Sequence, residues 1–195
     1  MAVRIRLAQG QDAEAIAGIY RPFVEATAIS FETEAPGREE MARRIAETME
    51  SYPWLVCEIG GGVVGYAYAT QHRVRAAYRW SVDTSVYVGQ EHRRSGVGRG
   101  LYTSLFGILA AQGFFNAYAG ITLPNPASVA LHESIGFKAV GVYQRVGYKL
   151  GAWHDVGWWQ LRLNSNDLSP GEPRDLASVR RDPAWESLAL LAREK

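Results

Sequence analysis

The stretch Trp80–Gly100, WSVDTSVYVGQEHRRSGVGRG, decides the fold that we expect for the chain. Its first half, Ser81–Val88, mixes β-branched and aromatic residues in alternation with polar ones, which is typical of a strand. A polar turn follows over Gly89–Ser95, and an apolar series at helical spacing begins at Leu101. The stretch therefore predicts a strand, a basic glycine-rich turn and a helix.

Three glycines occupy alternate positions before the expected helix: Gly96, Gly98 and Gly100. Glycine lets the backbone approach a ligand closely and adopt positive φ at little cost. A helix start also offers unpaired N–H groups and the positive end of a dipole. These features together predict a phosphate-binding turn. Positive charge is added by Arg93, Arg94 and Arg99.

Two nucleotide-binding motifs fit this turn poorly. A P-loop requires Gly-Lys-Ser/Thr after its glycines, whereas Arg99 and Leu101 follow them here. A dinucleotide fingerprint requires glycines directly after the strand and an acid about 20 residues later. No Asp or Glu lies between Glu91 and Glu133. An ordinary strand-to-helix turn is the remaining alternative. The three glycines beside three arginines favour a ligand-binding turn over it.

The composition limits the function classes. A chain of 195 residues with 47% hydrophobic residues forms one domain, or one domain and a tail. The net charge of +1 gives no reason to expect nucleic-acid binding. The single cysteine, Cys57, excludes an intrachain disulfide, and four scattered histidines do not indicate a metal site. Without an N-terminal apolar region or a long apolar run, we expect a cytoplasmic protein that does not contact membranes.

The remaining segments alternate between strand and helix patterns in the order β-α-α-β-β-β-α-β-α-β-β. Helices are expected from cap Asp12, from Pro36 in a first turn, from Leu101, and from cap Asn125 to Gly136. This order predicts an α/β or α+β domain with a mixed sheet. The strand patterns outside the opening stretch cover Val3–Leu7, Trp54–Ile59, Val63–Thr70, Asn116–Ile121, Phe137–Val146 and Asp155–Leu163.

The composition changes beyond Asn164, where NSNDLSPGEPRD is polar and contains prolines. We expect a domain over residues 1–163, followed by a linker and tail over residues 164–195. Trp185, Leu188 and Leu191 share one face of a short helix, if one forms. The pattern does not decide whether this tail packs on the domain or on a partner.

Two motifs carry a resemblance to a known superfamily. Arg93–Gly98 resembles the Arg/Gln-x-x-Gly-x-Gly/Ala loop of the GCN5-related N-acetyltransferases (GNAT), which holds the acetyl-CoA pyrophosphate. Asn125–Phe137 resembles their Asn-x-x-Ala/Ser-x-x-Leu-Tyr-x-x-x-Gly-Phe segment, with His132 at the usual tyrosine position. The resemblance implies a central mixed, mostly antiparallel sheet flanked by helices.

Further motifs are similar to the phosphinothricin N-acetyltransferase family. They are Tyr52–Val56, Thr84–Val88, the His132 variant, Gly147–Lys149 and Gly151–Leu161. The similarity extends from about Val3 to Leu163. It implies acetyl transfer from acetyl-CoA to the amino group of a small glutamate-like compound such as phosphinothricin or methionine sulfoximine. It also implies a homodimer and no metal.

The resemblance also assigns the acetyl-CoA contacts. The strand residues implied are Val86, Tyr87 and Val88, whose backbone N–H groups can also face the thioester carbonyl. The loop and helix residues implied are Arg94, Ser95, Gly96, Val97, Gly98, Arg99 and Asn125.

Asp83 and His132 are the candidate acid and base groups. Related enzymes have a glutamate at the place of Asp83, usually considered the base. Asp83 is shorter, and pairing with Arg73, Arg75 or Arg79 is its structural alternative. His132 has the ordinary pKa better suited to proton transfer, about 6.5, and a core histidine is its alternative.

Arginines can bind both oxygens of a carboxylate or a phosphinate, which favours Arg73 and Arg75 as an anion clamp. A solvated basic loop is the alternative. The resemblance places the substrate contacts at Arg73, Val74, Arg75, Asp83, Thr84 and Ser85. Phe31, Tyr78 and Trp153 are candidate pocket walls, His72 and His92 are expected at the surface, and His154 is interpreted as structural.

Two other functions compete with acetylation of a small amino acid analogue. One is acetylation of a peptide or protein amine, which would not require the paired arginines. The other is a non-catalytic acyl-CoA sensor, for which the shorter Asp83 is the best argument. Cys57 lies in an apolar run and is expected to be buried, so we expect direct transfer and no acetyl-enzyme.

Overall fold

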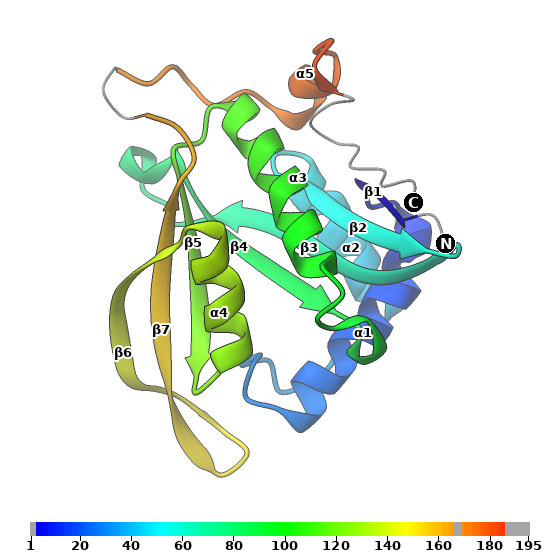
Figure 1. Cartoon of the computed structure of the whole chain (residues 1–195), viewed down its shortest axis with the longest axis vertical. Coiled ribbons are helices and arrows are strands. Elements are labelled where there is room, and N and C mark those ends of the chain that lie inside the picture. Colours follow the sequence, from blue (N-terminus) through cyan, green and yellow to red (C-terminus); the bar gives the residue numbers. More distant parts are fainter. Residues whose placement is uncertain (1–2, 166–168, 186–195) are drawn as a thin grey trace.

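The computed structural model describes residues 3–165 and 169–185 of the chain. Its centre is one seven-stranded sheet in the order β1-β2-β3-β4-β5-β7-β6 (Figure 1). All neighbouring strands are antiparallel except β4 and β5, which are parallel. The predicted mixed, mostly antiparallel sheet is thereby confirmed. The strands are β1 (Val3–Leu7), β2 (Trp54–Ile59), β3 (Gly62–Gln71), β4 (Ser81–Val88), β5 (Asn116–Leu123), β6 (Lys138–Lys149) and β7 (Ala152–Arg162).

Helices cover both faces of the sheet (Figure 1). Helices α1 (Ala13–Ala26) and α2 (Arg38–Met49) lie on one face, and α3 (Val97–Gln112) and α4 (Pro126–Ile135) lie on the other. Strand side chains alternate between the faces and so form two cores. Leu55 and Cys57 pack with the α3 side, whereas Trp54 and Val56 pack with the α1 and α2 side.

Two helices begin at other residues than the sequence predicts. Helix α3 starts at Val97, after Gly96 with φ of 87°, so the expected start at Leu101 is wrong by a full turn. A Cβ atom on Gly98 would lie 3.2 Å from the Leu131 side chain, so this glycine also serves close packing against α4. Helix α2 starts at Arg38, with Gly37 as its cap, so Pro36 precedes the helix.

The sheet opens between its two parallel strands. β4 and β5 pair at only three positions, and the last pair is Asp83 with Tyr118. On its other side, β4 remains paired with β3 as far as Val88. The edge of β4 from Thr84 to Val88 therefore has no partner strand within the part of the chain that the structure describes, and α4 lies beside this opening (Figure 1).

The described part of the tail packs on the domain. The Arg174 amide donates to the Gln112 carbonyl oxygen at the end of α3 over 2.7 Å, and the Trp80 indole donates to the Gly171 carbonyl over 2.8 Å. Helix α5 (Leu176–Arg180) buries Leu176 and Val179. Leu188 and Leu191, two of the three residues of the expected amphipathic helix, lie outside the described residues. Among the helices in residues 3–165 and 169–185, none is both long and apolar enough to span a bilayer.

Candidate active site

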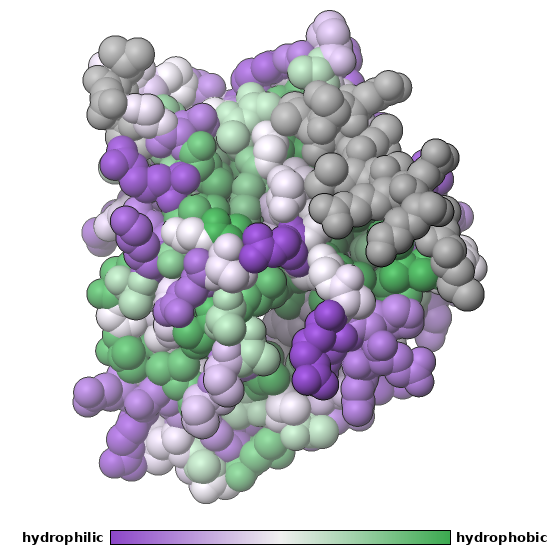
Figure 2. All heavy atoms as spheres, in the orientation of Figure 1, coloured by the Kyte–Doolittle hydropathy of each residue, from purple (hydrophilic) through white to green (hydrophobic). Residues whose placement is uncertain are grey.

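A cleft occupies the opening between β4 and β5. It encloses about 390 Å³ of empty space, part of it open to solvent. The face shown in Figure 2 is hollowed near its middle, where α4 and the N-terminal part of α3 lie in Figure 1. Strand β4, strand β5, α3 and α4 all contribute to the walls. The lining residues are Ile29, Thr84, Ser85, Val86, Tyr87, Tyr102, Ala119, Gly120, Ile121, Thr122, Asn125, Ser128 and His132.

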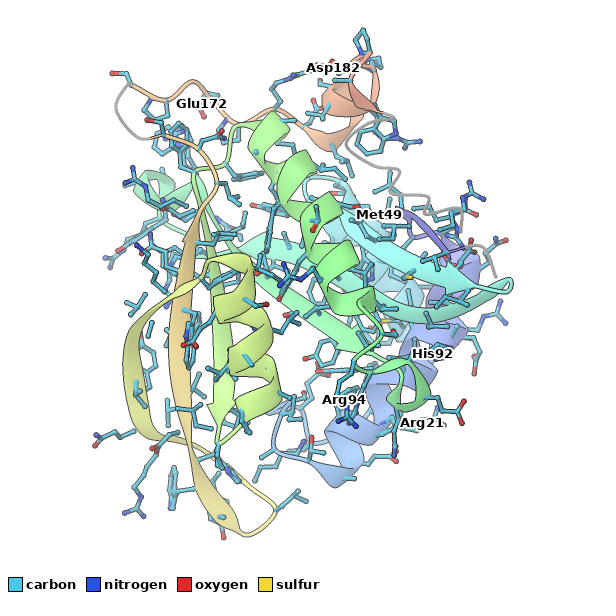
Figure 3. All side chains as sticks on the ribbon, viewed as in Figure 1. Arg21, Met49, His92, Arg94, Glu172 and Asp182 are labelled. Atoms are coloured by element: carbon cyan, nitrogen blue, oxygen red, sulfur yellow. The ribbon has the colours of Figure 1, made fainter. Side chains whose placement is uncertain are left out.

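The glycine-rich turn leads into α3 beside the cleft, where a Cβ atom on Gly98 would lie 3.9 Å from the Val86 side chain. The first hydrogen bond of α3 runs from the Gly100 amide to the Gly96 carbonyl, so the three preceding amides lie before the helical ladder begins. Arg94 is exposed and has φ of 60° (Figure 3 shows it in the loop between β4 and α3). Arg99 donates to the carbonyl and the hydroxyl oxygen of Ser134, which braces α3 against α4.

His132 is buried at the back of the cleft, with 3% of its surface exposed. Its Nδ1 lies 2.7 Å from the Ser128 carbonyl oxygen, so Nδ1 carries the proton and donates. Its Nε2 lies 3.0 Å from the Tyr102 hydroxyl, which then donates to it. Burial lowers the pKa of His132, although the Ser128 carbonyl opposes this effect. His132 and its partner Tyr102 both line the cleft.

Asn125 has a structural contact as well as a place in the cleft wall. Its carboxamide oxygen accepts a hydrogen bond from the Ser128 amide over 3.2 Å and caps α4. This confirms the predicted cap and fixes Asn125 at the cleft. Val86 and Val88 pack toward α3, while the ring of Tyr87 packs edge-on against Tyr20 on α1.

Asp83 lies on the face of the sheet opposite α3, and its partner is His72. The two side chains are joined by a 2.6 Å hydrogen bond between Nδ1 and Oδ1. The prediction of His72 at the surface is wrong, because only 12% of its side chain is exposed. The suggested pairing of Asp83 with an arginine side chain is also not what the structure contains. Burial raises the pKa of Asp83, and the hydrogen bond from His72 and the charge of Arg73 oppose this effect.

The predicted anion clamp lies on the exposed segment between β3 and β4. Arg73 donates to the His72 carbonyl oxygen over 2.8 Å, and its guanidinium lies 5.8 Å from the centre of the Trp158 ring. Arg75 is exposed, and Val74 is 88% exposed. The structure therefore brings Arg73 to the Asp83 neighbourhood and leaves Arg75 and Val74 at the solvent.

The three predicted wall aromatics do not line the cleft at β4 and β5. Phe31 packs on Gly147, where an added Cβ atom would overlap its ring, and Ile29 of the same loop lines the cleft in its place. Tyr78 is 45% exposed, and Trp153 packs against Tyr148 on the β6–β7 hairpin.

The loop that carries Ile29 is fastened by a buried lysine. The ammonium of Lys149, at the end of β6, donates to the Ser30 carbonyl over 2.7 Å and to the Val24 carbonyl over 2.6 Å. Only 7% of Lys149 is exposed, and burial lowers its pKa. The β6–β7 hairpin thus holds the loop between α1 and α2 against the mouth of the cleft.

A second cavity, of about 530 Å³ of empty space, lies on the α1 and α2 side of the sheet. Two of its lining residues pair with β4 residues of the candidate site. Tyr68 pairs with Ser85, which lines the cleft, and Thr70 pairs with Asp83, the candidate base. The buried indole N–H of Trp54 has no hydrogen-bond partner among the described residues. The lining residues are Tyr20, Glu32, Met41, Arg44, Thr48, Trp54, Tyr66, Tyr68 and Thr70.

Comparison with known proteins agrees with this geometry. The model of the acetyltransferase (GNAT) domain family matches residues 5–158. The chain belongs to this family. It is 43% identical over 177 residues to a phosphinothricin N-acetyltransferase of Streptomyces viridochromogenes, covering 91% of this chain and 94% of the relative. It is 35% identical to an L-methionine sulfoximine/L-methionine sulfone acetyltransferase of Salmonella typhimurium, covering 83% of this chain and 95% of the relative.

A solved GNAT structure has the same fold. The phosphinothricin acetyltransferase of Sinorhizobium meliloti, crystallised in complex with acetyl-CoA, superimposes with a TM-score of 0.84 at 35% identity. The match covers 88% of this chain and 95% of the other. The family resemblance inferred from the motifs is thereby confirmed.

Within this GNAT domain, Cys57 is fully buried, and burial raises the pKa of its thiol to about 11. It belongs to the core on the α3 side and is not among the residues that line the cleft. Among residues 3–165 and 169–185, no group of three or more His, Cys, Asp or Glu side chains is arranged to hold a metal ion.

Sequence reasoning did not identify two side chains that contact the candidate catalytic residues. Tyr102 belongs to the helical series of α3 and has the appearance of a core residue, so its hydroxyl contact with His132 carries no local signal. His72 follows β3, and its contact with Asp83 depends on the register between β3 and β4. One partial indication of this contact is present in the sequence, which is that the alternation of β4 places Asp83 on the same face of the strand as Ser85.

Proposed function

We propose that this GNAT protein is an N-acetyltransferase that moves the acetyl group of acetyl-CoA to the amino group of a small glutamate-like amino acid analogue, in one direct step. The observation that carries the proposal is the opening between β4 and β5, bordered by a glycine-rich helix start. The 43% identity to a phosphinothricin N-acetyltransferase supports the choice of acceptor class. The buried Cys57 supports a route without an acetyl-enzyme.

The cofactor is proposed to bind along the α3 and α4 side of β4. The amides that begin α3 would receive the pyrophosphate, and the exposed Arg94 would add charge. Arg99 would act through its brace to α4, since its guanidinium already donates to Ser134. The proposed contacts are Val86, Tyr87, Val88, Arg94, Ser95, Gly96, Val97, Gly98, Arg99 and Asn125.

The proposed reaction joins the amine nitrogen to the thioester carbon and breaks the bond from carbon to sulfur. Backbone N–H groups on the unpaired edge of β4 would stabilise the oxyanion, worth about 3–4 kcal/mol for a well-placed donor. Asp83 would receive the ammonium proton. The Tyr102 hydroxyl, whose single proton is donated to Nε2 of His132 at rest, would turn that proton to the departing thiolate.

The acceptor is proposed to approach from the α1 and α2 side, where Tyr68 and Thr70 of the second cavity pair with Ser85 and Asp83 of β4. Arg73 and Arg75 would bind its carboxylate and phosphinate or sulfoximine groups, because guanidinium groups bind two oxygens at once. Val74, Thr84 and Ser85 complete the proposed acceptor contacts.

Thiol release tests the proposal directly. The protein is incubated with acetyl-CoA and phosphinothricin, methionine sulfoximine, glutamate or a peptide with a free amine. We expect thiol release with the glutamate-like analogues and none with the peptide. Acetyl-CoA binding without release from any amine would show a sensor and overturn the enzyme, whereas release with the peptide alone would overturn the acceptor class.

We also propose a homodimer in the cytoplasm. β6 is an edge strand, and its hairpin with β7 exposes seven large apolar side chains at 50% to 62% of their surface. Such an edge is a candidate for pairing with another chain. Sedimentation equilibrium should give twice the mass of one chain. Val142→Glu should lower the measured mass toward that of a single chain. The seven exposed apolar residues of the hairpin are Val140, Val142, Tyr143, Val146, Tyr148, Leu150 and Trp153.

A further inference from the structure

His72 is held in one orientation by aromatic side chains. Its ring stacks on Tyr118 of β5, with the ring centres 4.3 Å apart and the planes 15° apart. Trp158 of β7 lies edge-on at 6.2 Å, and Tyr78, further along the segment between β3 and β4, lies edge-on at 6.1 Å. Three elements therefore fix the imidazole plane, unlike the long, mobile side chains of a surface ion pair.

This orientation directs Nδ1 of His72 at the carboxylate of Asp83, 2.6 Å from Oδ1. A carboxylate only accepts, so Nδ1 carries a proton and donates. In a neutral ring with its proton on Nδ1, Nε2 keeps its lone pair. No protein group within residues 3–165 and 169–185 is hydrogen-bonded to Nε2, so this nitrogen is left for water or for a substrate.

We propose that His72 and Asp83 form a single proton-accepting couple for the acetyl transfer proposed above, on which this inference rests. The acceptor arrives as an ammonium ion, R–NH₃⁺. One proton passes to the couple, either to Oδ2 of Asp83 or to Nε2 of His72, directly or through a water. The charge of the couple changes from −1 to 0, and the amine regains the lone pair that attacks the thioester carbon.

The position of the couple suits this role. Asp83 is the last residue of β4 that pairs with β5, so the couple lies at the point where the sheet opens. The next residues, Thr84 and Ser85, line the cleft. Asp83 is part of the proposed contact surface, and His72 both positions its carboxylate and offers Nε2 as a second proton acceptor.

Among the residues that the structure describes, few other ionisable groups face the couple. They are Arg73 and Tyr78 of the loop, and Tyr118 of β5, whose pKa is raised by burial and by the charge of Asp83. Arginine and tyrosine side chains ordinarily titrate at about pH 10 and above. Burial raises the pKa of Asp83 as well, which favours proton uptake by the couple. The acidic limb of the pH profile should thus report on the couple.

The test measures kcat/KM for the acceptor from pH 5.5 to pH 9 in the wild type, His72→Gln, His72→Ala and Asp83→Ala. We expect His72→Ala to lose about tenfold or more and to have its acidic limb displaced. Added imidazole should restore activity to His72→Ala and not to Asp83→Ala. His72→Gln keeps a donor near Asp83 but cannot titrate, so it should fold normally and remain slow. His92→Ala serves as the matched histidine control and should keep wild-type activity.

Three results separate the possible failures. Loss of activity in His72→Ala by one factor at every pH, without imidazole rescue, would show packing only and overturn the couple. Wild-type rates in His72→Gln would also overturn it, since a titrating ring would be unnecessary. A wild type that binds acetyl-CoA and acetylates no amine would overturn the proposed function itself, before any variant is compared. Unchanged acetyl-CoA affinity in the variants confirms that they are folded.

Discussion

The two faces of β4 differ in the chemistry that they offer. Thr84 and Val86 face α3 and α4, where the glycine-rich helix start and the pair of Tyr102 and His132 lie. Asp83 faces the other side, where it contacts His72 and pairs with Thr70 of the second cavity. Because strand side chains alternate, one strand can present different side chains to two substrates that meet at its open edge. We therefore assign acetyl-CoA to one face and the amine to the other.

His132 and His72 show the same contrast. Both ring nitrogens of His132 are occupied, by the Ser128 carbonyl and the Tyr102 hydroxyl. His72 uses one nitrogen for Asp83 and keeps the other free of protein hydrogen bonds in the described residues. A histidine with one free nitrogen can exchange protons, while one with two fixed partners mainly orients them. The following changes test this division of the two faces.

Asp83→Asn should have the largest effect. The amide cannot take up a proton, and its geometry remains close to that of the carboxylate. We expect kcat/KM for the acceptor to fall by about 100-fold or more, with acetyl-CoA affinity unchanged. Steady-state kinetics and calorimetry measure the two quantities. Glu172→Asn, on the exposed tail, is the control. Activity within threefold of the wild type would remove Asp83 from the reaction.

Arg75→Ala and Arg94→Ala should act on opposite substrates. Loss of a charged contact costs about 1.5–3 kcal/mol, which is about tenfold or more in affinity. Arg75→Ala should raise the KM for the acceptor and leave that for acetyl-CoA, and Arg94→Ala should do the reverse. Both side chains are exposed, so folding is not at risk. If either variant changed both KM values equally, the assignment of one substrate to each face would be wrong.

The fold was predictable because its signals are local. The alternation in Ser81–Val88, the glycines before α3 and the cap at Asn125 each identify an element from a few neighbouring residues. The start of α3 was missed because Gly98 and Gly100 weaken a helix in isolation. They are accepted there because side chains of α4 and β1 occupy the space of their missing Cβ atoms.

The site was predictable only in part, since its contacts depend on register and packing. Asp83 and His132 stand out by residue type, and their motifs give their places. The partner of Asp83 depends on how β3 and β4 align across a segment of nine residues, from His72 to Trp80, that no local pattern fixes. Tyr102 differs from a core tyrosine only by the position of its hydroxyl near His132.

Tyr102→Phe should have a smaller effect on the cofactor face. It removes the hydroxyl and keeps the ring that stacks on Phe106. We expect kcat to fall about tenfold for an acceptor whose step depends on thiolate departure, with both KM values near those of the wild type. With a more reactive thioester, whose thiolate is a better leaving group, the decrease in kcat caused by Tyr102→Phe should be smaller. An equal loss with both thioesters would contradict the proposed donation to the thiolate.

The smallest expected effect is on stability in mild acid, and it concerns His132 alone. Burial lowers its pKa in the folded protein, so below about pH 6.5 the unfolded chain binds more protons than the folded one. The free energy of unfolding should therefore fall as pH falls through this range, by about 1.4 kcal/mol for each unit by which the pKa is lowered. Urea unfolding at pH 7.5 and pH 5.5 measures it. Between pH 7.5 and pH 5.5, His132→Gln should lose less free energy of unfolding than the wild type does. His92→Gln should lose as much as the wild type. Equal losses in all three proteins would mean that the buried ring is charged in the folded state, and His132 would then be an acid in its own right.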